Sequence, residues 1–339
     1  MSGSVPSKRA SLAEVAEAAG VSISTVSKVA NGSADVADRT RVHVEKILKE
    51  RGYVATRNRR RSLVPVTLMA HDMTSPDTLD VVRGAVRAAG ETGVDLSLAT
   101  FPQDLEDPRW IDELRAEGRK GAVVITSSFG EVQRARFRSN RMPLVVIDPL
   151  SAPDPGTYSV GSTDWAGGLE ATEYLVGLGH RDIVMLGGRL DTKASRARVS
   201  GHVAGRAGAS LDPDGARVLG GDFTYASGLE SGIQLLSEPR PPTAIFAASD
   251  VQALGVLEAA RRAGIRVPED LTVVGYGDLV IARSSAPLLT TIRQPFDQMG
   301  AEAIEQVAEL MSGSTTRPLH TELATHLMVR ESSGPPRST

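Results

Sequence analysis

The side chains that carry out most enzyme chemistry are either missing from this 339-residue sequence or badly spaced for it. Cysteine is absent, which excludes disulfides, thiolate zinc sites, iron–sulfur clusters and cysteine nucleophiles. There is no Gly-x-x-x-x-Gly-Lys-Ser/Thr loop, no Gly-x-Ser-x-Gly elbow and no Gly-x-Gly-x-x-Gly turn that opens a helix. The six histidines show no metal-ligand spacing. We therefore expect no enzymatic activity, no cofactor and no bound metal.

Basic side chains, in contrast, gather where they could bind a polyanion. Residues 1–61 contain twelve Lys or Arg and six Asp or Glu, a net charge of +6. The whole chain carries −3, so the remaining 278 residues carry −9. A small basic segment joined to a larger acidic one indicates a nucleic-acid-binding module attached to a module of another kind. Chance clustering of solvated charges is the alternative.

The basic segment contains the start and stop signals of three short helices. Ser11 can cap the first, with Glu14 three residues later completing a capping box, and Gly20 ends it. A second helix is expected over 23–30 and a third over 38–51. Two helices joined by a tight glycine-containing turn, with a third in support, form a helix-turn-helix.

From residue 63 onward the pattern changes to strands that alternate with helices. The expected strands are 64–70, 94–100, 122–126, 144–147, 183–186, 244–247 and 271–274. The expected helices lie near 77–91, 106–117, 130–139, 165–177, 195–208, 226–237, 250–263 and 296–311. This alternation predicts an α/β fold with parallel sheets covered on both faces, and its length predicts two lobes.

The resulting domain plan has four parts. Residues 1–54 form a helix-turn-helix domain, 55–63 a basic hinge or linker, 64–330 a two-lobed domain, and 331–339 a flexible tail. No apolar run is long enough to span a membrane and no signal sequence opens the chain, so a cytoplasmic location is expected.

Several segments in order along the chain resemble one family of transcription regulators, the lactose-repressor or LacI/GalR family. The segment Leu12–Gly32 resembles the DNA-binding headpiece of that family. Further matching segments follow at 179–183, 248–250 with 253–255, 267–270 with 273–276, 289–295 and 329–332. The resemblance implies a three-helix headpiece followed by a two-lobed parallel α/β domain like the periplasmic sugar-binding proteins.

The resemblance also implies which headpiece residues meet DNA. The second helix would lie in the major groove, with Ile23, Ser24 and Lys28 reading bases. The residues placed at phosphates are Ser22, Thr25 and Asn31. The alternative is that Ser22 only caps its helix and Lys28 is simply solvated. Asp35 departs from the family pattern, and a phosphate contact there is not expected.

The hinge departs further from the family, which usually has Asn-x-x-Ala-Arg-x-Leu and wedges the leucine into the minor groove. This chain has an arginine cluster before Leu63, namely Arg57, Arg59, Arg60 and Arg61. Leu63 could act as the wedge only with a shifted register. We interpret the cluster as an arm that holds phosphates or a narrow minor groove. A flexible basic linker is the alternative.

The resemblance places a ligand site between the two lobes, at the carboxyl ends of the parallel strands. The expected contacts are Ser75, Asp77, Thr126, Asp148, Arg198, Phe223, Ser249, Asp278 and Phe296. Hydroxyls, carboxylates, a guanidinium and aromatic faces suit a polyol. Gly277 stands where the family usually has an acidic residue, and Ser249 where it often has Asn. Helix capping or loop order is the alternative role for Asp148 and Asp278.

These inferences predict a homodimeric regulator, a repressor that binds a palindromic site on double-stranded DNA. Its effector is expected to be a sugar or oligosaccharide. The alternatives are a co-repressor type that requires a purine-like ligand, and a plain solute-binding protein. The headpiece, and the lack of an export signal, argue against a plain solute-binding protein.

Overall fold

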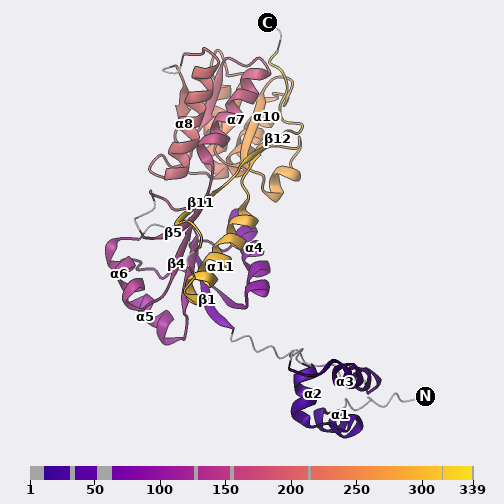
Figure 1. Ribbon diagram of the computed structural model, residues 1–339. Coiled ribbons are helices and arrows are strands. Elements are labelled where there is room, and N and C mark those ends of the chain that lie inside the picture. Colours follow the sequence, from indigo (N-terminus) through magenta and orange to yellow (C-terminus); the bar gives the residue numbers. More distant parts are fainter. Residues whose placement is uncertain are drawn as a thin grey trace, which may run out of the picture. The chain divides into compact units, whose positions relative to one another are not determined.

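The computed structural model describes residues 11–30, 35–51, 63–125, 129–152, 156–212, 215–314 and 316–337. The chain divides into two compact units, Met1–Leu63 and Val64–Thr339 (Figure 1). No helix in the described ranges is both long enough and apolar enough to cross a bilayer.

The first unit has three helices, α1 (Leu12–Ala19), α2 (Ile23–Ala30) and α3 (Asp38–Glu50), as predicted. The capping box of α1 is present: Ser11 Oγ accepts from the Glu14 backbone N–H, and Glu14 Oε2 accepts from the Ser11 N–H. The valines Val15, Val26 and Val44, one from each helix, are buried together. This small core holds α2 against the other two helices.

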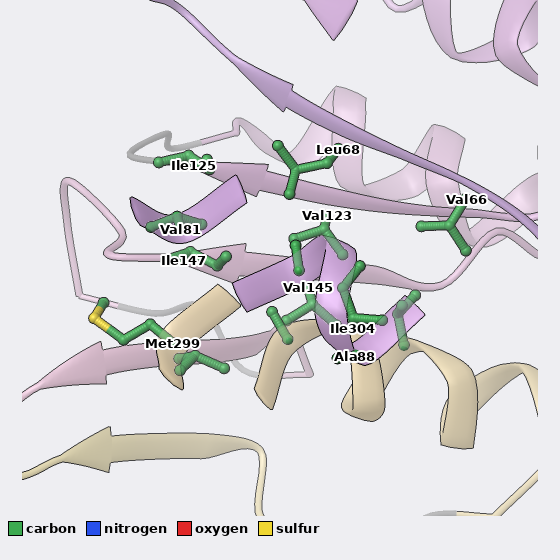
Figure 2. Close-up of a cluster of buried hydrophobic side chains, with 14 of the residues drawn as sticks. Val66, Leu68, Val81, Ala88, Val123, Ile125, Val145, Ile147, Met299 and Ile304 are labelled. Atoms are coloured by element: carbon green, nitrogen blue, oxygen red, sulfur yellow. The ribbon is translucent and has the colours of Figure 1, made fainter. Parts of the chain in front are cut away.

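The first lobe of the second unit is built on a parallel sheet with the strand order β11-β5-β4-β3-β1-β2. The strands are β1 (Val64–Ala70), β2 (Val94–Thr100), β3 (Gly121–Ile125), β4 (Leu144–Ile147), β5 (Tyr158–Ser162) and β11 (His320–Leu323). The helices are α4 (Pro76–Thr92), α5 (Arg109–Ala116), α6 (Glu131–Ser139) and α11 (Phe296–Ser312). Figure 2 shows how Val81 of α4 and Met299 and Ile304 of α11 cover valines, leucines and isoleucines of the sheet.

The second lobe repeats this plan with the strand order β12-β10-β9-β8-β6-β7. Its strands are β6 (Ile183–Leu186), β7 (Arg217–Leu219), β8 (Ala244–Ala247), β9 (Thr272–Gly277), β10 (Thr290–Arg293) and β12 (His326–Met328). The helical elements are α7 (Asp164–Gly177), α8 (Lys193–Gly208), α9 (Tyr225–Leu236), α10 (Asp250–Ala263) and the short 3₁₀ turn η1 (Val280–Arg283). Only β12 runs antiparallel to its neighbour.

The chain passes between the lobes three times, after β5, after β10 and after β11. The first and third crossings are hydrogen-bonded to each other. Thr163 Oγ1 lies 3.0 Å from Thr325 Oγ1 and accepts from the Thr325 backbone N–H at 3.0 Å. The two-lobed α/β architecture is therefore as predicted, with α11 and β11 returning to complete the first lobe.

The C-terminal segment differs from the prediction of a flexible tail. Ser332 Oγ donates to the Val273 carbonyl at 2.6 Å and accepts from the Thr290 N–H at 2.9 Å. The Gly334 N–H donates to Thr272 Oγ1 at 3.0 Å. The prediction was wrong for residues 331–337 because their backbone and hydroxyl groups find partners on the second sheet, which the sequence does not show.

Glycines set the close approach of α4 and α11. A Cβ atom added at Gly84 would overlap the backbone carbonyl of Asp297. We expect Gly84→Ala to lower the free energy of unfolding by about 1–3 kcal/mol, because the two helices must separate. Gly90→Ala, on the same helix and facing open space, should instead stabilise by about 0.4–1 kcal/mol. Thermal unfolding of the two variants checks the contrast, and similar melting temperatures would contradict it.

Candidate functional site

A cavity of about 190 Å³ lies between the lobes of the second unit. Seven of the predicted ligand contacts line it: Ser75, Asp77, Asp148, Arg198, Phe223, Ser249 and Phe296. Thr192, Tyr276 and Gln294 also line it and were not predicted. Thr126 lies outside the described residues. The two lobes thus bring together residues that are up to 221 positions apart in the chain.

The ends of strands and the starts of helices position these side chains. Ser75 and Asp77 stand at the start of α4, Asp148 follows β4 directly, and Phe296 is the first residue of α11. Asp148 has φ +48° and Phe223 has φ +68°, a backbone region that non-glycine residues rarely adopt. Such strained positions persist where the surrounding structure holds them, and they concentrate at ligand sites.

Arg198 is the most constrained charge in the cavity wall. Its Nε donates to Asp164 Oδ1 at 2.9 Å and its Nη1 to the Ala248 carbonyl at 2.8 Å. Its Nη2 donates to Gln294 Oε1 at 3.0 Å. The guanidinium carbon lies 3.8 Å from the centre of the Tyr276 ring, in cation–π geometry. At least three of its five N–H groups are therefore committed to acceptors of the second unit.

Asp164 balances the charge of Arg198, since both side chains are nearly fully buried and form one ion pair. The two carboxylates that line the cavity, Asp77 and Asp148, form no ion pair with any residue that the structure describes. The pKa of Asp148 is raised to about 7, first by burial and then by the nearby Asp164 carboxylate; Arg198 and Lys193 partly offset this. The cavity therefore offers carboxyl oxygens that can accept from the hydroxyl groups of a ligand, and the raised pKa lets Asp148 also donate when it is protonated.

The shifted pKa of Asp148 has a consequence for stability. A carboxyl whose pKa is higher in the folded state than in the unfolded state stabilises the fold below the unfolded pKa of 3.8. That contribution is lost as the pH rises through about 7. We expect Asp148→Asn to gain stability relative to wild type between pH 4 and 8, by at most about 1.4 kcal/mol per pH unit. Unfolding of both proteins across this range measures it, and parallel pH profiles would contradict it.

Ser249 lines the cavity, but its hydroxyl is already engaged. Its Oγ donates to the Phe223 carbonyl at 2.9 Å and accepts from the Gln252 N–H at 3.1 Å, which caps α10. Ser249 therefore has no free proton for a ligand and can offer only an acceptor lone pair.

Asp278 does not line the cavity, contrary to the prediction. Its side chain is buried beside three arginines: it pairs with Arg293 and Arg330, and Arg283 lies 3.5 Å away. The prediction failed because the carboxylate is held by these arginines, which come from other parts of the chain and which the sequence does not show as its partners. These ion pairs agree with the alternative role given for Asp278, which is to order a loop.

The headpiece residues assigned to DNA fall on the exposed face of α2. Ile23, Ser24 and Lys28 are exposed, with 54% of Ile23 accessible, whereas Val26 and Val29 of the same helix are buried. These three side chains are therefore accessible to a partner, as base-reading residues must be.

Ser22 and Thr25 form a small hydroxyl network at the start of the helix. Ser22 Oγ accepts from the Thr25 N–H at 3.1 Å and lies 2.8 Å from Thr25 Oγ1 and from Ser24 Oγ. Ser22 therefore caps α2. This cap does not prevent the same hydroxyl from contacting a phosphate. Lys28 Nζ lies 3.9 Å from Asp35, an exposed and weak pair. Asn31, Arg57, Arg59, Arg60 and Arg61 lie outside the described residues.

Two protein-family descriptions match the chain. Residues 11–56 match the bacterial regulatory proteins of the lacI family. Residues 172–333 match a periplasmic-binding-protein-like domain. The first match covers the three-helix unit, and the second covers most of the second lobe and the return of the chain to the first.

Full-length relatives are also similar. The HTH-type transcriptional regulator CelR of Thermobifida fusca is 34% identical, over 96% of this chain and 98% of that protein. The ribose operon repressor of Escherichia coli K12 is 32% identical, over 96% of this chain and 100% of that protein.

Solved structures agree with these relatives. A CelR–cellobiose complex has a TM-score of 0.71 and 35% identity, and a lac repressor dimer bound to operator and an anti-inducer has a TM-score of 0.71 and 26% identity. Each comparison covers 96% of this chain and all of the other.

Proposed function

Because this chain belongs to the LacI family of bacterial regulatory proteins, we propose that it represses transcription as a homodimer on a palindromic operator and that a sugar in the cavity controls this binding. The relatives named above are regulators rather than enzymes. The protein acts in the cytoplasm, where the operator is.

One observation carries the choice of effector: the cavity combines carboxylate acceptors, guanidinium donors and aromatic rings. Asp77 and Asp148 can accept from hydroxyl groups, and Phe223 and Phe296 offer apolar faces to a sugar ring. A purine-like effector would use the rings for stacking and is the second candidate. Cellobiose and ribose, which the relatives' names point to, are the first sugars to test.

Thermal unfolding with added ligand tests this assignment. A ligand that binds only the folded protein raises its melting temperature by mass action. We expect a neutral mono- or disaccharide from a panel with cellobiose and D-ribose to stabilise the full-length protein. That sugar should also change its affinity for operator DNA selected from genomic fragments. If only purine bases stabilise the protein, the effector is a purine-like compound and not a sugar. If a sugar binds without changing the affinity for operator, that sugar does not regulate DNA binding.

The headpiece carries the proposed DNA contacts. The exposed Ile23, Ser24 and Lys28 would read base edges in the major groove, while Ser22, Thr25 and Asn31 would hold phosphates. One three-helix unit touches few bases, and a second copy related by twofold symmetry doubles the sequence that is read. The arginine cluster 57–61 would add electrostatic affinity.

We expect Lys28→Ala to weaken binding to the preferred operator by about 1–3 kcal/mol and to relax base preference at one position of each half-site. The reason is that a lysine can donate to guanine O6 and N7, and alanine cannot. Lys46→Ala, an exposed lysine on α3 that pairs with Glu50, is the matched control. Selection of binding sites from random DNA by each variant gives the readout. An unchanged preference for Lys28→Ala would show that α2 does not read bases there.

A further inference from the structure

Lys193 joins the two lobes of the second unit beside the cavity. It is the first residue of α8 in the second lobe, and its backbone N–H donates to the Leu150 carbonyl of the first lobe at 2.7 Å. Its side chain also reaches the first lobe, where Nζ lies 3.0 Å from Glu322 Oε1 of β11. Thr192 and Ala194 line the cavity, whereas the Lys193 side chain does not. Lys193 therefore connects the lobes without being part of the cavity wall.

The other polar contacts between the lobes belong to the three chain crossings. Thr163 and Thr325 bond to each other where the first and third crossings meet, and the Gln294 N–H donates to the Gly277 carbonyl at the second. Away from the crossings, Lys193 makes both of the hydrogen bonds that join described residues of the two lobes. The covalent chain keeps the partners at a crossing together when the lobes rotate, but it does not hold Lys193 to its partners. Its contacts are therefore the ones that oppose separation of the lobes.

Both contacts are of a kind that a movement of the lobes would break. The N–H group at the first position of a helix has no acceptor within the helix, so it pairs here with the Leu150 carbonyl of the other lobe. The ion pair is partly exposed, with 33% of the Lys193 side chain and 51% of the Glu322 side chain accessible. Such pairs stabilise weakly, by an amount that favours the arrangement containing them roughly 1.5-fold to fivefold. A preference of this size adjusts an equilibrium between two arrangements and does not lock it.

We propose that Lys193 is a latch between the lobes, and that its ion pair with Glu322 sets how readily the lobes separate and thereby how much effector the regulator needs. The inference rests on the proposed control by a ligand in the cavity. A ligand that contacts both lobes favours the arrangement in which they enclose it, and its apparent affinity is proportional to the fraction of molecules in that arrangement. Loosening the latch should therefore weaken effector binding, although neither residue lines the cavity.

Hydrogen exchange of the Lys193 amide in the full-length protein tests the latch without any ligand. Glu322→Gln removes the charge from β11, 129 positions away in the chain, and leaves Lys193 itself unchanged. We expect the Lys193 amide to exchange roughly 1.5 to 5 times faster in this variant, because the N–H exchanges when the Leu150 carbonyl moves away. High salt, which screens an exposed ion pair, should speed this exchange in wild type and not in Glu322→Gln. Glu113→Gln makes the same chemical change at an exposed position of α5 and should leave the rate unchanged.

Sugar binding measures the regulatory part of the inference. Calorimetry with cellobiose and with D-ribose compares wild type with Lys193→Met, Glu322→Gln and the double variant. Each single variant should bind the sugar roughly 1.5 to 5 times more weakly than wild type. The double variant should be no weaker than either single variant, because both substitutions remove the same contact. Effects that multiply in the double variant would show that the two residues do not act as a pair.

Three further results would overturn the inference. An unchanged exchange rate at Lys193 in Glu322→Gln would show that the ion pair does not hold the lobes together. Equally faster exchange at the Gln252 amide, which is bonded within the second lobe, would indicate general destabilisation instead of lobe separation. Faster exchange at Lys193 with unchanged sugar affinity would remove the link to the effector. If no sugar binds to wild type, the proposed effector class fails, and the exchange rate still decides for or against the latch.

Discussion

Arg198→Ala is expected to lower the free energy of unfolding by roughly 3–5 kcal/mol and to abolish the response to the effector. The first effect arises because Asp164, 5% exposed and 2.9 Å from Arg198 Nε, would keep a buried charge without a cationic partner. The second arises because the ligand would lose the guanidinium, and Gln294 and the Ala248 carbonyl would lose their donor. The alanine variant alone therefore cannot separate loss of folding from loss of the site.

A double variant separates the two effects. Asp164→Asn with Arg198→Met removes both charges and keeps similar volumes, and such replacements of buried ion pairs are often close to neutral. We expect it to recover most of the lost stability and to bind operator as wild type does, with no effector response. Unfolding measurements and operator titrations with and without the sugar give the readout. A double variant that still responds to the sugar would remove Arg198 from the effector site.

Neutralising Arg57, Arg59, Arg60 and Arg61 together should have the largest effect on DNA binding. Each phosphate contact contributes roughly 0.9 to the slope of log affinity against log salt concentration. Four lost contacts would flatten that slope by about 3.6 and weaken binding by roughly 10²–10³-fold at low salt. Specific and non-specific DNA should be affected alike, because phosphates carry no sequence information.

Titrations of operator and random DNA from 50 to 300 mM salt measure the effect of this fourfold variant. Neutralising four other exposed basic residues of the second unit, Arg83, Arg87, Arg115 and Lys120, changes the net charge equally and is the control. An unchanged slope would make the arginine cluster a spacer. Loss at the operator alone would mean that it reads sequence.

The headpiece could be predicted from the sequence because its signals are local. The capping box of Ser11 and Glu14, and the glycine that ends α1, act within one turn of the helix. Several strands could not be predicted for the opposite reason. The sequence of β11, His-Thr-Glu-Leu, has little strand character, and it becomes a strand because β5 offers an open edge to it.

The ligand site likewise contains some residues that the sequence predicts and others that it does not. Residues that follow a predicted strand, such as Ser75 and Asp148, fall in the cavity because the carboxyl ends of parallel strands meet there. Asp278 also follows a strand, yet its carboxylate pairs with Arg293 and Arg330 outside the cavity. The place of Gln294 in the cavity wall could not be predicted, because it depends on where the chain crosses between the lobes.

The return of α11 and β11 to the first lobe has a consequence for synthesis on the ribosome. Val66, Val123 and Val145 leave the exit tunnel early, but Met299 and Ile304, which cover them, are made more than 150 residues later. The first lobe therefore stays unfinished, with the part of its sheet that α11 covers exposed, until nearly the whole chain has emerged. At 5–20 residues per second that interval lasts on the order of ten seconds or more. Nascent chains that stall before α11 should consequently be held by chaperones, and a stop codon there should give an insoluble product rather than a shorter folded one.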